Sequence, residues 1–214
     1  MSGLGFQGFG LAGSFLVLFT ALLLLTIQDW RVSLIALSIQ YIGVFVLVAI
    51  HWPLTMAFTK LVAGWIATAV LGTAVFTVAQ TAGSTDRPAT SQTLFLRVTG
   101  LSPSAWVFRV ITAAMIVLVA LTMAPATVDW VPGIDFEQVL GALILIGLGL
   151  LHLGLTASPF RVVIALLTTL SGFEIIYAAV EVSTLVAGLL AGVSLGLALI
   201  GAYLLVSSMP EVEA

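Results

Sequence analysis

The chain contains no cysteine. This absence excludes disulfides, thiol catalysis, thiolate zinc sites and iron–sulfur clusters held by its own side chains. We expect no cofactor or metal in this chain, and any redox centre must belong to a partner protein.

Charge is almost as scarce as cysteine. Asp, Glu, Lys and Arg make up 7% of the 214 residues, and the formal net charge is −3. Such a chain offers no basic surface for nucleic acid, and no Walker-type or dinucleotide-type glycine motif interrupts it. Neither a nucleic-acid partner nor nucleotide chemistry is expected.

Apolar residues dominate what is present. They make up 61% of the chain, and the mean hydropathy is +1.28, far above that of water-soluble globules. The apolar runs are long enough to cross a hydrocarbon layer of about 30 Å as helices, and the alternating pattern of barrel strands is missing. These features predict an all-α integral membrane protein. Residues 1–7 carry no basic residue, which argues against a cleavable signal peptide.

The apolar runs predict seven transmembrane helices separated by short polar turns. The predicted helices cover residues 11–27, 33–50, 56–79, 106–124, 137–156, 160–181 and 184–207. The segment 79–104, rich in Ser, Thr, Gly and Pro, is the one long predicted loop.

Seven crossings place the termini on opposite sides of the membrane, and all the arginines then lie on the side of the C-terminus. They are Arg31, Arg87, Arg97, Arg109 and Arg161. The opposite side carries Asp129, Asp135, Glu137 and Glu181. By the positive-inside rule the C-terminus is cytoplasmic and the N-terminus lies outside. The alternative for each arginine is a role in topology alone.

Glu174 is the strongest functional candidate because it lies inside the sixth apolar run. It lies about 20 Å beyond Arg161 at about 1.5 Å per residue, past the midplane. Ionisable groups at this depth are functional by default, since an ionised one costs about 2.5–3.5 kcal/mol to insert. Ser171, Glu174, Ala178 and Glu181 are predicted to share one polar face. The alternative is a neutral Glu174 that bonds a neighbouring helix.

Lys60 is the only lysine, and it follows the Trp52-Pro53 turn in the third predicted helix. If that helix begins near Thr55, Lys60 reaches the depth of Glu174 and can form a pair with it. The alternative is a lysine whose stem snorkels to the outer interface.

Three further polar residues lie in or near the apolar runs. Gln40 is midway along the second predicted helix, where an amide can orient a partner but cannot hold a proton. His152 lies near the cytoplasmic side and could feed protons, or could be an interfacial residue. His51 lies at the outer end, so the two imidazoles differ too much in depth to bind one haem.

Several glycines are predicted to allow close helix packing: Gly43, Gly64, Gly72, Gly172 and Gly188. Gly172, beside Glu174, is also the best candidate for a π-bulge or kink.

The chain also shows an internal similarity. Arg31 and Arg161 each precede a helix with one polar residue midway, Gln40 or Glu174, and the sequence Leu-Val-Ala-Gly occurs at 61–64 and at 185–188. We interpret residues 1–80 and 137–214 as two parallel three-helix repeats, with 81–136 supplying a loop, a linking helix and an outer loop.

The residues around Glu174 resemble a known family. The stretch 170–182, Leu-Ser-Gly-Phe-Glu-Ile-Ile-Tyr-Ala-Ala-Val-Glu-Val, is similar to the second helix of the K-type subunit of respiratory complex I and the C subunit of Mrp antiporters. There, Gly-x-Glu-Leu followed by a small or amide residue and Ala-Val marks an acid within the membrane. Arg161 matches basic residues at that family's cytoplasmic turn. The whole chain, with its Thr59-Lys60 pair, is more similar to component E of hydrogenase-4.

The chain departs from the family pattern at three positions. Gln40 stands where the first repeat would have an acid, Lys60 replaces the second acid of the K-type subunit, and Thr184 is its nearest counterpart in the last helix. One complete acidic site remains, so independent pumping by both repeats is not expected.

The resemblance implies a non-catalytic membrane-arm subunit of a complex I-like respiratory complex, most similar to group 4 membrane-bound hydrogenases. Glu174, Lys60, Glu181, Gln40 and His152 would then contribute to proton or Na⁺ translocation, with antiporter-like and other membrane-arm subunits as partners in the cytoplasmic membrane. Two alternatives remain: a subunit of an Mrp-type cation/proton antiporter without a redox module, and a structural scaffold in which Glu174 is neutral.

Overall fold

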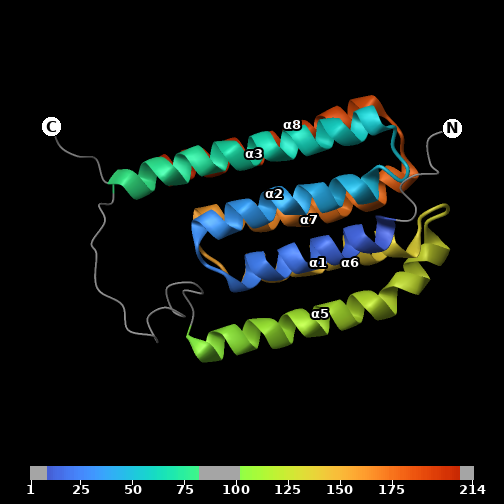
Figure 1. Ribbon diagram of the computed structural model, residues 1–214, viewed down its shortest axis with the longest axis horizontal. Helices are drawn as coiled ribbons and strands as arrows, with labels where there is room; N and C mark the ends of the chain where they lie inside the picture. Colours follow the sequence, from blue (N-terminus) through green and yellow to red (C-terminus); the bar gives the residue numbers. More distant parts are fainter. Residues whose placement is uncertain (1–8, 82–101, 208–214) are drawn as a thin grey trace.

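The computed structural model describes residues 9–81 and 102–207, and the regular structure in these ranges is helical (Figure 1). The helices are α1 (Gly10–Thr26), α2 (Trp30–Val48), α3 (Leu54–Thr81), α5 (Pro103–Trp130), α6 (Phe136–Gly154), α7 (Pro159–Val180) and α8 (Thr184–Ser207). The all-α class is confirmed, and a helix lies at each of the seven predicted positions, with small differences at most ends. Arg87, Arg97 and most of the predicted long loop lie outside the described residues.

The largest difference in helix length concerns α5, which the sequence predicts to end at residue 124. In the structure it continues through Pro125 to Trp130. A proline inside a helix removes one hydrogen bond and crowds the preceding turn. Here Ala124 is fully buried against Ile134 and Val139, and Val128 packs on the same cluster. This packing on both sides of Pro125 keeps the last turns of α5 helical.

Six of the seven described helices are long and apolar enough to cross a membrane, and α1 is shorter, with 17 residues. The helices α5 and α8 are the least buried of the six. Their exposed side chains include Ile111, Met115 and Leu118 on α5 and Leu189 and Leu199 on α8. Apolar surface of this kind suits contact with lipid, and the fold is that of a multi-pass membrane protein.

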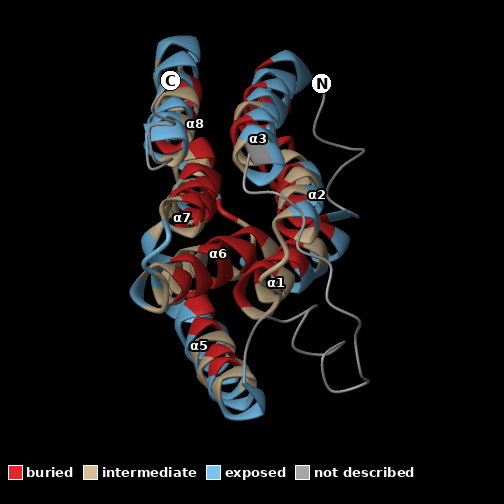
Figure 2. Cartoon of the chain, turned by 90° about the vertical axis from the view of Figure 1, so that its left-hand side faces the viewer, coloured by how far each residue is buried: buried red, intermediate tan, exposed pale blue. Residues whose placement is uncertain are grey.

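The helices form two groups of three that pack against each other (Figures 1 and 2). The contacts between the groups include those of α1 with α6, α2 with α7 and α3 with α8. In Figure 1, α1, α3, α6 and α8 run in one direction and α2, α5 and α7 run in the other, so the two helices of each of these three pairs are parallel. The helix α5 packs on α6 and α1, at the edge away from α3 and α8.

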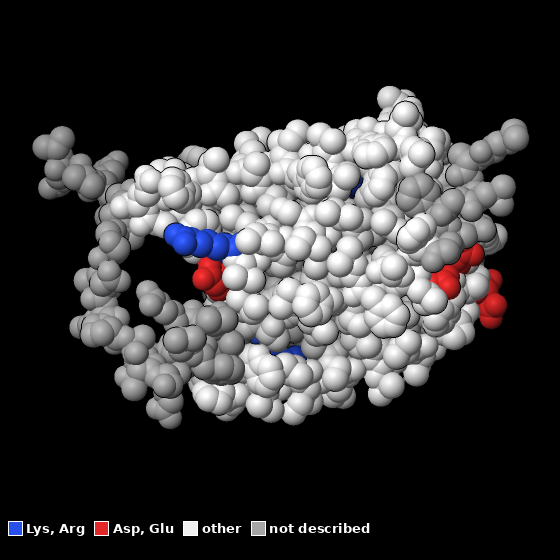
Figure 3. All heavy atoms as spheres, viewed as in Figure 1, with Lys and Arg blue, Asp and Glu red and all other residues white. Residues whose placement is uncertain are grey.

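The charged residues outside the helix centres lie near the two ends of the bundle. Arg31 and Arg161 lie in the first turns of α2 and α7, and Arg109 lies near the start of α5. The acids near the opposite end are Asp129, Asp135, Glu137 and Glu181. The face drawn in Figure 3 is almost free of charge between its ends. The predicted separation of these charges is therefore confirmed for the described residues.

Gly172 packs against the backbone of α6. A Cβ atom at this position would lie 2.7 Å from the carbonyl oxygen of Ala142 and 2.9 Å from the amide nitrogen of Ile146. The helix α7 is α-helical from Pro159 to Val180, so the π-bulge considered for Gly172 is absent from this segment. Close packing also applies at Gly43, Gly64 and Gly72. It does not apply at Gly188, where an added Cβ would meet nothing within 4 Å.

Candidate functional site

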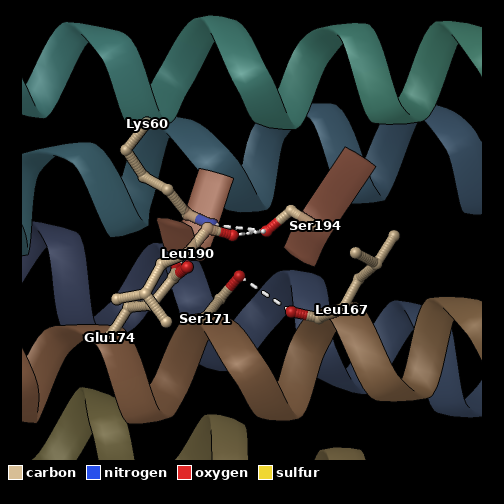
Figure 4. A network of polar contacts seen from close by, with 6 residues as sticks. All are labelled: Lys60, Leu167, Ser171, Glu174, Leu190 and Ser194. Atoms are coloured by element: carbon tan, nitrogen blue, oxygen red, sulfur yellow. Dashed lines mark hydrogen bonds and ion pairs between the residues drawn. The ribbon is translucent and has the colours of Figure 1, made fainter. Parts of the chain in front are cut away.

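Glu174 and Lys60 form an ion pair in the interior of the bundle (Figure 4). Glu174 lies on α7 and is 1% exposed, and Lys60 lies on α3 and is 5% exposed. Because α3 begins at Leu54, the stem of Lys60 starts deep enough to reach the carboxylate. The burial of Lys60 and its pairing with Glu174 are confirmed, and the snorkelling alternative is wrong.

Ser194 on α8 provides the second partner of the Lys60 ammonium group. Lys60 Nζ donates a hydrogen bond to Ser194 Oγ at 3.0 Å, and Ser194 Oγ donates to the carbonyl oxygen of Leu190 at 3.1 Å. The hydroxyl has one hydrogen, and because the Leu190 carbonyl receives it, a lone pair faces the ammonium group. Ser194 therefore fits a charged lysine, and three helices meet at this group.

Ser171 lies one turn before Glu174 on α7 but cannot donate to it. Its hydroxyl donates to the carbonyl oxygen of Leu167 at 2.8 Å, which uses its single hydrogen (Figure 4). Glu174 Oε1 has no hydrogen-bond partner among the described residues. One carboxylate oxygen thus faces Lys60, and the other keeps its lone pairs free to accept a proton.

Tyr41 on α2 brings a fourth helix to the site. Its ring centroid lies 5.4 Å from Lys60 Nζ, within the range of a cation–π interaction. The ring packs directly on Gly64 of α3, where an added Cβ would lie 2.5 Å from Tyr41 Cγ. The Tyr41 hydroxyl is buried and has no hydrogen-bond partner among the described residues. Gly64 therefore makes the room that Tyr41 needs beside Lys60.

Gln40 is fully buried but belongs to a neighbouring contact. Its Nε2 donates to Thr168 Oγ1 on α7 at 3.3 Å, while its Oε1 has no partner in the described part of the chain. Thr168, Ser171 and Glu174 follow one another along a buried face of α7. Gln40 is thus linked to the Lys60–Glu174 pair through this face and not by direct contact.

The predicted polar face of α7 ends before Glu181. Ser171, Glu174 and Ala178 are buried, but α7 ends at Val180 and the backbone of Glu181 is extended, with φ −138° and ψ 130°. The Glu181 side chain is exposed, and its carbonyl oxygen accepts a hydrogen bond from Trp52 Nε1 at 3.0 Å. The prediction that Glu181 continues the polar face is wrong, because α7 ends before Glu181 and its side chain is exposed, whereas Ser171 and Glu174 are buried.

Thr184 is likewise not the structural counterpart of Lys60. It is the first residue of α8 and is exposed, whereas Lys60 is buried. The residue of α8 that reaches the site is Ser194. Neither Ser194 nor Tyr41 was singled out from the sequence. A small hydroxyl is common in apolar helices, and the one signal for Tyr41 was its position beside Gln40.

The two histidines lie at opposite ends of the bundle, as predicted. His51 bonds the carbonyl oxygen of Gly133 at 2.7 Å and the side chain of Gln138 at 2.9 Å. His152 lies in the last turn of α6 and is 3% exposed, in a basic cluster with Arg109 and Arg161. Within the described residues no three His, Cys, Asp or Glu side chains gather as they would around a metal ion.

Comparisons with known proteins find no match to this chain among family models, curated proteins or solved structures.

Proposed function

We propose that this protein is a membrane-arm subunit of a complex I-like respiratory complex, most similar to component E of group 4 hydrogenases, in which Glu174 gains and loses a proton. The observation that carries the proposal is the buried Lys60–Glu174 pair between α3 and α7. The chain has no substrate site of its own in this role, and it passes charge changes to neighbouring subunits.

The energetics of the pair support a functional role. Removing two charges from water costs several kcal/mol per ion. Their mutual attraction offsets this cost only when the geometry of the pair is good and further hydrogen bonds support both groups. Here Ser194 and the Tyr41 ring support Lys60, while Glu174 Oε1 has no such support. An apolar pair would hold α3 to α7 without the cost of removing charges from water. Packing alone therefore does not explain why this position is charged.

The same geometry suggests how the pair responds to charge. A cation that approaches Glu174 competes with Lys60 for the carboxylate, and an anion that approaches Lys60 weakens its hold on Glu174. In either case Glu174 Oε1 is the atom that accepts a proton, because it has no hydrogen bond to lose. Lys60 then keeps Ser194 and Tyr41 as partners. Gln40 and His152 lie outside this contact and have supporting roles at most.

The arrangement of the helices supports the family assignment. The contacts of α1 with α6, α2 with α7 and α3 with α8 are those expected of two parallel copies of one three-helix unit. The arginines near the starts of α2, α5 and α7 favour a cytoplasmic C-terminus and an outer N-terminus. A location in the cytoplasmic membrane follows from the proposed complex.

Proton movement in the intact assembly tests the role of Glu174. Inverted membrane vesicles that carry the complete complex are compared with vesicles carrying Glu174→Gln, and with Glu181→Gln as the matched control. We expect Glu174→Gln to lower coupled proton uptake at least about 10-fold, as for loss of a positioned acid–base group. The exposed Glu181→Gln should keep it. Unchanged uptake in Glu174→Gln would reject the proposal.

A double variant separates the proton role from a scaffold role. Glu174→Gln with Lys60→Met removes both charges, and a neutralised pair is often as stable as the original. A scaffold predicts that this variant assembles and transports normally, whereas our proposal predicts assembly without transport. Iron, nickel or flavin in the purified complex distinguishes a respiratory complex from an antiporter that lacks a redox module.

A further inference from the structure

A second buried polar region lies at the end of the bundle where α5 and α7 begin and α6 ends. It is the basic cluster of Arg109 on α5, His152 in the last turn of α6 and Arg161 in the first turn of α7. The three groups lie within electrostatic range of one another. This region is separate from the Lys60–Glu174 site, and the proposed proton role gives its two arginines no part.

Arg109 has partners that explain its burial. Its guanidinium donates to the carbonyl oxygen of Leu25 at 2.7 Å and to that of Leu155 at 3.3 Å. These carbonyls stand at the C-terminal ends of α1 and α6, where helix dipoles favour a positive charge. Arg109 therefore joins three helices and has a structural role.

Arg161 and His152 lack such partners in the part of the chain that the structure describes. The NH1 nitrogen of Arg161 and Nε2 of His152 are buried, and neither forms a hydrogen bond among the described residues. Arg161 also lies in the first turn of α7, where the helix dipole is positive and opposes a cation. The described acid at this end is Asp29, whose carboxylate accepts from the amide nitrogen of Arg31 at 2.8 Å. The two arginines thus concentrate positive charge without an acid paired to them in the described ranges.

An apolar groove begins near Arg109, the member of the cluster that lies on α5. It lies between α1 and α5 and has a volume of about 370 Å³. Its lining includes Val110, which follows Arg109, and Leu22, one turn before the Leu25 carbonyl that holds Arg109. From there it continues along both helices past Leu18 and Ala114 to Leu121. A groove of this shape at a lipid-facing surface suits an acyl chain.

We propose that the basic cluster binds the phosphate group of an anionic phospholipid, with one acyl chain of that lipid in the α1–α5 groove. Guanidinium groups match phosphate oxygens in geometry and charge, and basic pockets between transmembrane helices bind anionic head groups. Arg161 and His152 donate to the phosphate, and Arg109 adds charge from its fixed position. The groove favours a lipid over free phosphate. This proposal does not depend on the proton role of Glu174.

Lipid titration of the purified full-length chain in detergent tests this site. Phosphatidylglycerol, phosphatidylcholine with the same acyl chains, and inorganic phosphate are each added, and bound lipid is counted by native mass spectrometry while thermal unfolding is followed. We expect phosphatidylglycerol alone to bind and raise the unfolding temperature. Arg161→Gln should weaken this binding about 10–100-fold, as for loss of a charge-assisted hydrogen bond. The matched control Arg31→Gln, at an exposed arginine of the same end, should not.

A groove-filling variant separates the two parts of the site. Ala114→Phe should weaken the binding of phosphatidylglycerol while it leaves Arg161 in place. Equal stabilisation by inorganic phosphate, or by phosphatidylcholine, would overturn the proposal, because the ligand would then be a free anion or any lipid. Equal affinity of Arg161→Gln and Arg31→Gln for phosphatidylglycerol would overturn it as well.

Discussion

The two buried polar regions of this protein differ in how their charge is balanced. In the bundle interior, Lys60 and Glu174 neutralise each other, and Ser194 holds the ammonium group. In the basic cluster, Arg109, His152 and Arg161 face one another without an acid among the described residues. The location of each region explains the difference. A charge at mid-membrane depth has only the protein for a partner, whereas a charge at the helix ends can use a lipid head group.

This comparison also separates two kinds of response. The balance of the interior pair can be changed by moving one proton, because both members belong to the chain. No acid of the described residues pairs with the basic cluster, so in our proposal its charge balance changes when an anion from outside binds or leaves. Substitutions in the two regions should therefore change the free energy of unfolding in different ways.

The largest effect is expected from Lys60→Met alone. This change leaves Glu174 buried without its cation, and breaking a buried pair on one side costs about 3–5 kcal/mol. The free energy of unfolding, measured by denaturant titration of the purified chain in detergent, should fall by this amount.

The double variant Lys60→Met/Glu174→Gln is the control for that prediction. It removes both charges, and most of the lost stability should return because no unpaired charge remains buried. If Lys60→Met and the double variant lose the same stability, then packing of the lysine stem and not charge balance explains the effect.

The next effect distinguishes two members of the basic cluster. Arg109→Gln loses hydrogen bonds to Leu25 and Leu155, so the free energy of unfolding should fall by about 1.5–3 kcal/mol. Arg161→Gln loses no hydrogen bond among the described residues and removes a part-buried cation that Arg109 repels, so in lipid-free detergent it should leave stability unchanged or raise it. A loss for Arg161→Gln as large as for Arg109→Gln would contradict the view that Arg161 is unpaired without lipid.

The sequence was sufficient to predict the helices and the acid at the centre of the site. Long apolar runs specify membrane helices almost by themselves, since lipid leaves the backbone few alternatives. Glu174 and Lys60 stood out because so few charges occur within those runs. Their common depth followed from the turns that precede each helix, and the ion pair confirms it.

The partners of Lys60 could not be predicted because they depend on helix rotation and not on composition. Ser194 and Tyr41 reach Lys60 only because α3, α8 and α2 present these faces to one another. Glu181 and Thr184 were misjudged for a related reason: each lies where a helix ends or begins, and spacing rules no longer hold there. Thr184 precedes the second copy of the Leu-Val-Ala-Gly motif as Lys60 precedes the first, but the two copies have different surroundings.

The smallest predicted effect uses this repeated motif directly. Gly64 and Gly188 close its two copies, but an added Cβ at Gly64 would lie 2.5 Å from Cγ of the buried Tyr41 ring, whereas one at Gly188 would meet nothing within 4 Å. Gly64→Ala should therefore destabilise the protein by about 1–3 kcal/mol through overpacking. Gly188→Ala should be neutral or stabilising by up to about 1 kcal/mol, because alanine favours the helix. Denaturant titration in detergent compares the two variants. Equal effects would mean that Tyr41 does not pack on α3, and the cation–π contact with Lys60 would then lose its structural basis.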